Sequence, residues 1–151
     1  MKKLIFSILV VQICFLNGCK KYPDGPLISF DSAKHRITGN WTVEAFYING
    51  RDSTSLLKPY PCEMNMSFSI DGENFELNKN RCWGLGGGWT LFDNCRYLTF
   101  GAHNISDCPE CKNFGPYCSQ RHKWKIRRLT NHEMWLTVHY DGKDYEVDFK
   151  K

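Results

Sequence analysis

Alternation of apolar and polar residues at every second position is the feature that most restricts how this 151-residue chain can fold. The alternation recurs from Trp41 to Phe149, and no strong helical pattern separates the alternating segments. Dipeptides such as Asn49-Gly50, Asp71-Gly72 and Asp141-Gly142 predict tight turns, which join only antiparallel neighbours. We therefore expect an all-β domain, a single eight-stranded antiparallel up-and-down barrel, because closure removes exposed strand edges. A two-sheet sandwich is the alternative.

The predicted strands cover residues 41–47, 64–70, 75–77, 89–92, 96–100, 121–129, 133–140 and 144–149. Gly86 to Gly88 are expected to interrupt the chain before the fourth strand, and a long loop over residues 101–120 precedes the sixth. A short helix is predicted over residues 30–37, with Asp31 as its N-cap.

The second and third predicted strands form a hairpin whose register follows from its turn. With Asp71-Gly72 in the turn, Phe68 lies beside Phe75 and Met66 lies beside Leu77. Both pairs are apolar and fall on one face, so the register is self-consistent.

The N-terminal residues have the pattern of an export signal. Two lysines precede thirteen mostly apolar residues, Leu4 to Leu16, whereas a membrane-spanning helix needs about 20. Residues 16–19, Leu-Asn-Gly-Cys, resemble a bacterial lipobox. This resemblance implies cleavage before Cys19, a diacylglycerol on its thiol and acylation of the new amine. Several acyl chains hold a domain durably on a membrane. An ordinary signal peptide and a signal anchor are the alternatives.

The lipobox interpretation divides the chain into three segments. These are a signal peptide over residues 1–18, a lipidated cysteine and tether over 19–29, and the folded domain over 30–151. Removal of Lys2 and Lys3 lowers the formal charge from +4 to +2. A net charge this small excludes the strongly basic surface that binds nucleic acids. Lys20 and Lys21 follow Cys19, and no Asp stands in the second mature position, where it would favour the inner membrane. We therefore expect an outer-membrane lipoprotein of the cell envelope.

The segment Gly39-Asn40-Trp41, preceded by a short helix, resembles the GxW entry motif of lipocalins, in which the Trp plugs one end of the barrel. The mature chain also looks like the lipocalin-like lipoproteins of the Bacteroidota, which are mostly uncharacterised. The similar segments are KYPDGPLISF (21–30), GNWTVEAFYINGRD (39–52), GGWTLFDNCRYLTFG (87–101) and MWLTVHYDGKDYEVDF (134–149). The resemblance implies a fold and a location rather than an activity.

Aromatic residues are the richest signal for a binding site. We predict that the following residues line the interior as a candidate cavity for a small hydrophobic ligand: Trp41, Tyr47, Phe68, Trp83, Trp89, Trp124 and Tyr145. The alternative is a filled barrel that serves as a scaffold for surface interactions, since eight strands can just be filled by side chains. No nucleophile elbow, phosphate loop or HExxH motif is present, so neither an enzyme nor a cofactor is expected.

Six cysteines remain after Cys14 leaves with the signal and Cys19 takes lipid. In an exported protein they favour disulfides, with candidates at Cys62, Cys82, Cys108, Cys111 and Cys118. Cys62 and Cys82 flank one hairpin, whereas Cys95 is predicted in a turn at the opposite end without a partner. Alternatives for the Cys-Pro-Glu-Cys loop are a metal site of Cys108, Cys111 and Cys118 with His122 or His103, a redox pair, or free thiols.

Overall fold

The computed structural model describes residues 21–26, 28–57, 65–69, 74–79, 82–102 and 122–151. Among these residues, nine strands, a short α-helix and one 3-10 turn follow each other along the chain. The elements are α2 (Ala33–Ile37), β1 (Gly39–Ile48), β2 (Arg51–Asp52), η1 (Thr54–Leu57), β3 (Asn65–Phe68), β4 (Asn74–Lys79), β5 (Cys82–Phe92), β6 (Tyr97–Ala102), β7 (His122–Leu129), β8 (Glu133–Tyr140) and β9 (Lys143–Lys150).

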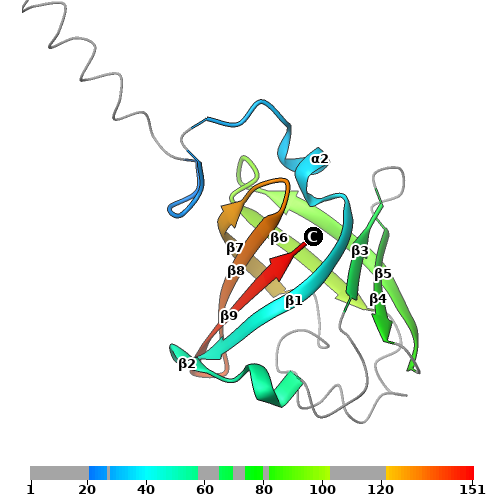
Figure 1. The fold of residues 1–151 in the computed structure, drawn as a ribbon, viewed down its shortest axis with the longest axis vertical. Coiled ribbons are helices and arrows are strands. Elements are labelled where there is room, and N and C mark those ends of the chain that lie inside the picture. The colour runs from blue at the N-terminus through cyan, green and yellow to red at the C-terminus, as the bar shows by residue number, and fades with distance from the viewer. Residues whose placement is uncertain (1–20, 27, 58–64, 70–73, 80–81, 103–121) are drawn as a thin grey trace, which may run out of the picture.

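All strands belong to one antiparallel sheet in the order β2-β1-β3-β4-β5-β6-β7-β8-β9, and β1 also pairs with β9. β1 pairs with β3 through Gly39 to Thr42 and with β9 through Thr42 to Ile48. The sheet curls around its inner face, with α2 at one end and the β8–β9 turn at the other (Figure 1). We call these the helix end and the far end.

The predicted all-β antiparallel architecture and the short N-terminal helix are confirmed, and β1 with β3 to β9 correspond to the eight predicted strands. The predicted β3–β4 register is also confirmed, because Phe68 pairs with Phe75 and Met66 pairs with Leu77. β2 is an additional two-residue strand. It follows the turn at Asn49, whose φ is +51°.

The predicted interruption at Gly86 to Gly88 is wrong, because β5 runs unbroken through the three glycines. Gly87 pairs with Phe75 on one side and with Ala102 on the other. Glycine usually weakens a strand. Here backbone pairing with β4 on one side and β6 on the other keeps the glycine segment extended.

A bulge in β1 changes which side chains face inward. The register against β9 shifts between Val43 and Ala45, which reverses the alternation beyond that point. Phe46 is therefore buried, with 1% of its surface exposed, whereas Tyr47 is half-buried. The predicted inward orientation of Tyr47 is wrong for this reason, since a strict period of two cannot anticipate an extra residue.

The core lies against the inner face of the sheet and extends under α2. Strands β6 to β9 supply much of it, and α2 closes it with Ala33 and Ile37. Residues at most 1% exposed in this core are Tyr22, Ile37, Trp41, Phe46, Phe68, Leu98, Trp124, Ile126, Leu129, Met134, Leu136, Val147 and Phe149.

Helix α2 is held by caps and by the end of the chain. Its N-cap is Ser32, whose hydroxyl accepts a hydrogen bond from the His35 N–H at 3.1 Å, so the predicted Asp31 cap is off by one residue. Trp41 Nε1 donates to the Ile37 carbonyl at 2.6 Å, and Lys151 Nζ donates to the Thr38 carbonyl at 2.7 Å. These bonds satisfy carbonyls that the end of a helix leaves without partners.

The predicted tether is folded onto the domain over part of its length. Tyr22 is 1% exposed and belongs to the core, and its hydroxyl donates to the Cys95 carbonyl at 3.0 Å. The guanidinium of Arg36 lies 5.6 Å from the centre of the Tyr22 ring. Asp24 forms an ion pair with Arg127, with 2.6 Å between Oδ2 and NH2. The folded domain therefore includes Tyr22 and Asp24, which precede the predicted boundary at residue 30.

We expect Tyr22→Ala to lower the free energy of unfolding by about 3 kcal/mol, because it removes a buried aromatic ring. Tyr22→Phe keeps the ring and loses only the bond to the Cys95 carbonyl, so a loss of about 1 kcal/mol is expected. Urea unfolding followed by tryptophan fluorescence measures both. Equal stability of Tyr22→Ala and the parent protein would contradict the docking of this segment.

Candidate functional site

An aromatic cluster fills the inner face of the sheet towards the helix end. Phe68 meets Trp89 edge-on with ring centres 5.8 Å apart, and it meets Phe100 in the same way at 6.2 Å. Phe100 stacks on Trp124 at 5.7 Å. Each of these four side chains is at most 3% exposed, as is Trp41. Rings at such distances are in contact, so this part of the interior is packed.

Of the seven residues predicted to line a ligand cavity, five lie in the core: Trp41, Phe68, Trp89, Trp124 and Tyr145. Tyr145 is 7% exposed and stacks on Phe46 at 6.1 Å, outside the first cluster. Tyr47 faces outward. Trp83 belongs to β5, but its side chain lies outside the described part. Phe100 was missed although it alternates with Leu98, and Phe46 was missed because of the bulge.

Towards the far end, some of the described apolar side chains are only partly buried. Ile48 and Val138 pack against the core but are only partly buried. The ring of His122 lies 4.6 Å from that of Tyr140, and burial lowers the pKa of this histidine. The neutral imidazole is therefore favoured beside the phenol. This end combines apolar side chains with two polar rings.

An open pocket of about 470 Å³ involves the outer side of β6 to β9, where most of its lining side chains are polar. The basic side chains of Lys123, Lys125 and Arg127 line it, and they alternate with buried core residues along β7. Lys123 Nζ lies 4.3 Å from the centre of the Tyr97 ring, and Arg127 NH1 lies 3.8 Å from Glu146 Oε2. The charges partly neutralise each other, so the pocket suits a polar ligand better than an apolar one.

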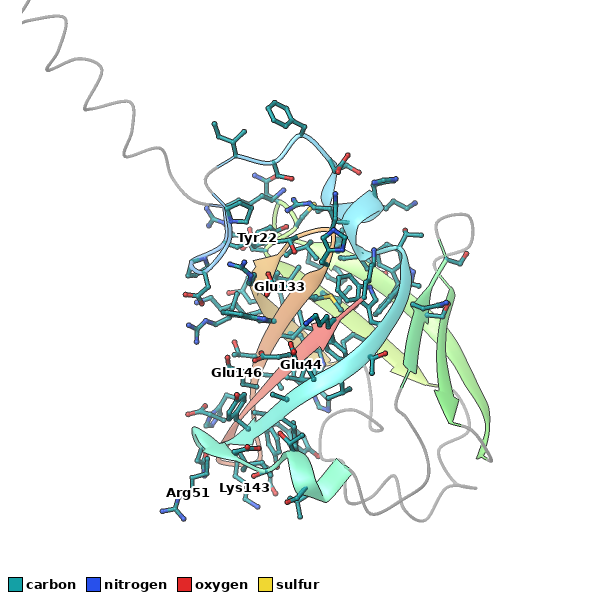
Figure 2. All side chains as sticks on the ribbon, viewed as in Figure 1. Tyr22, Glu44, Arg51, Glu133, Lys143 and Glu146 are labelled. Carbon is teal, nitrogen blue, oxygen red and sulfur yellow. The ribbon has the colours of Figure 1, made fainter. Side chains whose placement is uncertain are left out.

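An acidic strip crosses the outer face of β1, β8 and β9, and Figure 2 shows Glu44, Glu133 and Glu146 along it. Asp148 lies within the strip, paired with Ala45 and Trp135, and its buried Oδ1 has no hydrogen-bond partner in the described part. Burial raises the pKa of Asp148 to about 6. The carboxylates of Glu146, Glu44 and Glu133 also raise it, and Arg127 opposes them.

Cys95 lies in the β5–β6 turn at the helix end, and its thiol forms no disulfide with another described residue. Its backbone is left-handed, with φ of +63°, and the Tyr22 hydroxyl binds its carbonyl. Cys62, Cys108, Cys111 and Cys118 lie outside the described residues, and so does the side chain of Cys82. The predicted disulfides and the predicted metal site with His122 therefore stay predictions.

Within the ranges that the structure covers, no three His, Cys, Asp or Glu residues gather closely enough to hold a metal ion. Across those same ranges, no helix has the length and apolar character needed to cross a membrane. The predicted signal peptide and Cys19 precede the first described residue.

No protein-family model and no curated protein matches this chain. An uncharacterized protein from Bacteroides eggerthii DSM 20697, known from a crystal structure, superposes with a TM-score of 0.52 at 16% sequence identity. The match covers 76% of this chain and 99% of that one. At this identity the similarity shows a shared fold and nothing about activity.

The raised pKa of Asp148 predicts a pH-dependent stability. Because the folded protein holds this proton more tightly than the unfolded chain, the stabilisation is complete below about pH 4. It is lost as the pH rises through about 6. Asp148→Asn should remove this dependence and raise the free energy of unfolding at pH 7 by about 1 kcal/mol, after allowance for solvent screening.

Urea unfolding at several pH values between 4 and 7.5 (roughly the range of this titration) tests the expectation. Asp141→Asn, which changes an exposed turn carboxylate, is the control and should keep the slope of the parent protein. If Asp148→Asn also keeps that slope, the carboxyl does not titrate in this range.

Proposed function

We propose that this protein is a lipid-anchored lipoprotein of the cell envelope, whose lipocalin-like domain is a closed, filled barrel serving as a non-catalytic scaffold for surface interactions. The observation that carries the proposal is the packed cluster of Phe68, Trp89, Phe100 and Trp124. These rings occupy the space that a ligand would need at the helix end. We place the protein at the outer membrane because no Asp follows Cys19.

Two observations support closure of the sheet into a barrel. β1 pairs with β3 and with β9, so each strand from β3 to β9 has two neighbours. Trp41, in the GxW segment, is fully buried beneath α2, the position that a plug at one end of a lipocalin-like barrel would take. Its ring also lies 4.6 Å from Lys151 Nζ, which ties the end of the chain to the same place.

A second candidate function is the binding of a small hydrophobic molecule at the far end. The partly buried Ile48 and Val138, beside Phe46 and Tyr145, favour it. A ligand there would contact apolar side chains within the barrel and the His122–Tyr140 pair at its mouth. Pockets of this kind combine an apolar lining with a few polar groups.

Acylation is tested by expressing the full chain with and without Cys19→Ala in its host. The parent protein should carry acyl chains by intact mass and enter the detergent phase of a phase separation, whereas Cys19→Ala should stay in the aqueous phase. Cys95→Ala removes a different thiol and should behave like the parent protein. An acylated Cys19→Ala protein would refute the anchor.

Native mass spectrometry of the protein purified from host membranes decides between the two candidates. A filled scaffold retains no mass beyond its acyl chains. A binder retains an additional small molecule, which Val138→Trp should displace by filling the far end. Thr137→Trp, on the outward neighbour in β8, is the matched control and should leave the bound mass unchanged.

A further inference from the structure

The chain between the proposed anchor and the folded domain is very short. Cys19 and Tyr22 are three residues apart, and an extended chain spans at most about 3.6 Å per residue, so the lipidated cysteine lies within about 11 Å of Tyr22. Tyr22 itself is fixed in the core. A domain attached so closely cannot turn freely above the bilayer.

Several contacts hold this first segment against the outer side of β7. The Asp24 N–H donates to the Arg127 carbonyl at 3.0 Å, and its carboxylate accepts from Arg127 Nε at 2.6 Å. Arg128 donates to the Asp24 carbonyl at 2.5 Å. Both the backbone and the side chain of Asp24 form bonds with β7, so the position of this segment on the domain is fixed. Figure 2 shows Tyr22 beside the helix end of the sheet.

The same end carries three exposed apolar side chains. Ile28 is 73% exposed and Phe30 is 100% exposed, and both lie between the docked Tyr22 and α2. Phe92 is 44% exposed and ends β5, three residues before the Cys95 carbonyl that binds Tyr22. Figure 1 shows that residues 21–26 and 28–32, α2 and the β5–β6 turn gather at this end. Exposed apolar residues grouped in this way indicate an interaction surface.

Charged residues around this surface fit an anionic, interfacial partner. Lys21, Lys34 and Arg96 are exposed there, and so are Asp31 and Asp93. Asp24 is neutralised by Arg127, and Asp31 accepts a hydrogen bond from Asn131 at 2.8 Å. Exposed apolar side chains with lysine and arginine nearby are typical of segments that lie in the interface of a membrane.

We propose that the helix end is a membrane-contacting face, with Ile28, Phe30 and Phe92 in the interface of the bilayer that holds the Cys19 lipid. This inference rests on the proposed lipid anchor. The short link between Cys19 and Tyr22 brings this end to the bilayer. The far end, with η1 and the β8–β9 turn, then points away from the membrane and is the part available to other molecules (Figure 1).

The experiment reconstitutes the full acylated protein in vesicles of phosphatidylcholine and phosphatidylglycerol that contain a diazirine-bearing phospholipid. Light attaches this lipid only to side chains in contact with the bilayer. We expect label in the tryptic peptides 22–34 and 82–96, which carry Ile28, Phe30 and Phe92. Fragmentation of the peptides that carry Leu56 and Tyr140 should show no label on these two exposed apolar residues of the far end.

The triple variant Ile28→Ser, Phe30→Ser, Phe92→Ser should lose most of the label, whereas Leu56→Ser, a matched change at the far end, should leave it unchanged. Because all four side chains are exposed, these changes preserve the core. Intact mass of the same sample reports acylation independently. Absence of acyl chains refutes the proposed anchor. An acylated protein with unlabelled peptides 22–34 and 82–96, or with both ends labelled equally, overturns the membrane-contacting face, and unlabelled peptides would point to a protein partner there.

Discussion

Strand β1 is shared between two ladders, and the rest of the fold depends on this sharing. Its first residues pair with β3, its later residues pair with β9, and the two ladders overlap at Thr42. Trp41 precedes that overlap and is fully buried, with its indole N–H bound to the carbonyl of Ile37. Helix α2, the start of β1 and the end of β9 are thereby held together at one end of the core.

The extra residue at the bulge in β1 changes which side chains face the core and which face outward. After Val43 the side chain of Phe46 faces inward and stacks on Tyr145 in the core. Tyr47 moves to the outer face, where burial raises its pKa and the carboxylates of Asp148, Asp52, Glu146 and Glu44 raise it further. A side chain expected to meet a ligand thus joins the acidic strip instead.

The docking of residues 22–25 changes what the proposed lipid anchor implies. A free tether of eleven residues would let the domain sample every orientation. The buried Tyr22 and the Asp24–Arg127 ion pair leave only the residues before them to reach the membrane. Under the proposed anchoring, the orientation of the domain follows from packing in the core rather than from the lipid itself.

The sequence by itself determined the all-β class, the order of the strands and the β3–β4 register, because period-two alternation and tight turns are local signals. It also predicted inward side chains for Trp41, Phe68, Trp124 and Tyr145, and these four lie in the core. Only the tertiary structure decided the orientation of Tyr47, the continuity of β5 through its glycines and the burial of Tyr22. Each of these depends on a partner distant in sequence, namely β9 for the bulge, β4 and β6 for the glycines, and the Cys95 carbonyl for Tyr22.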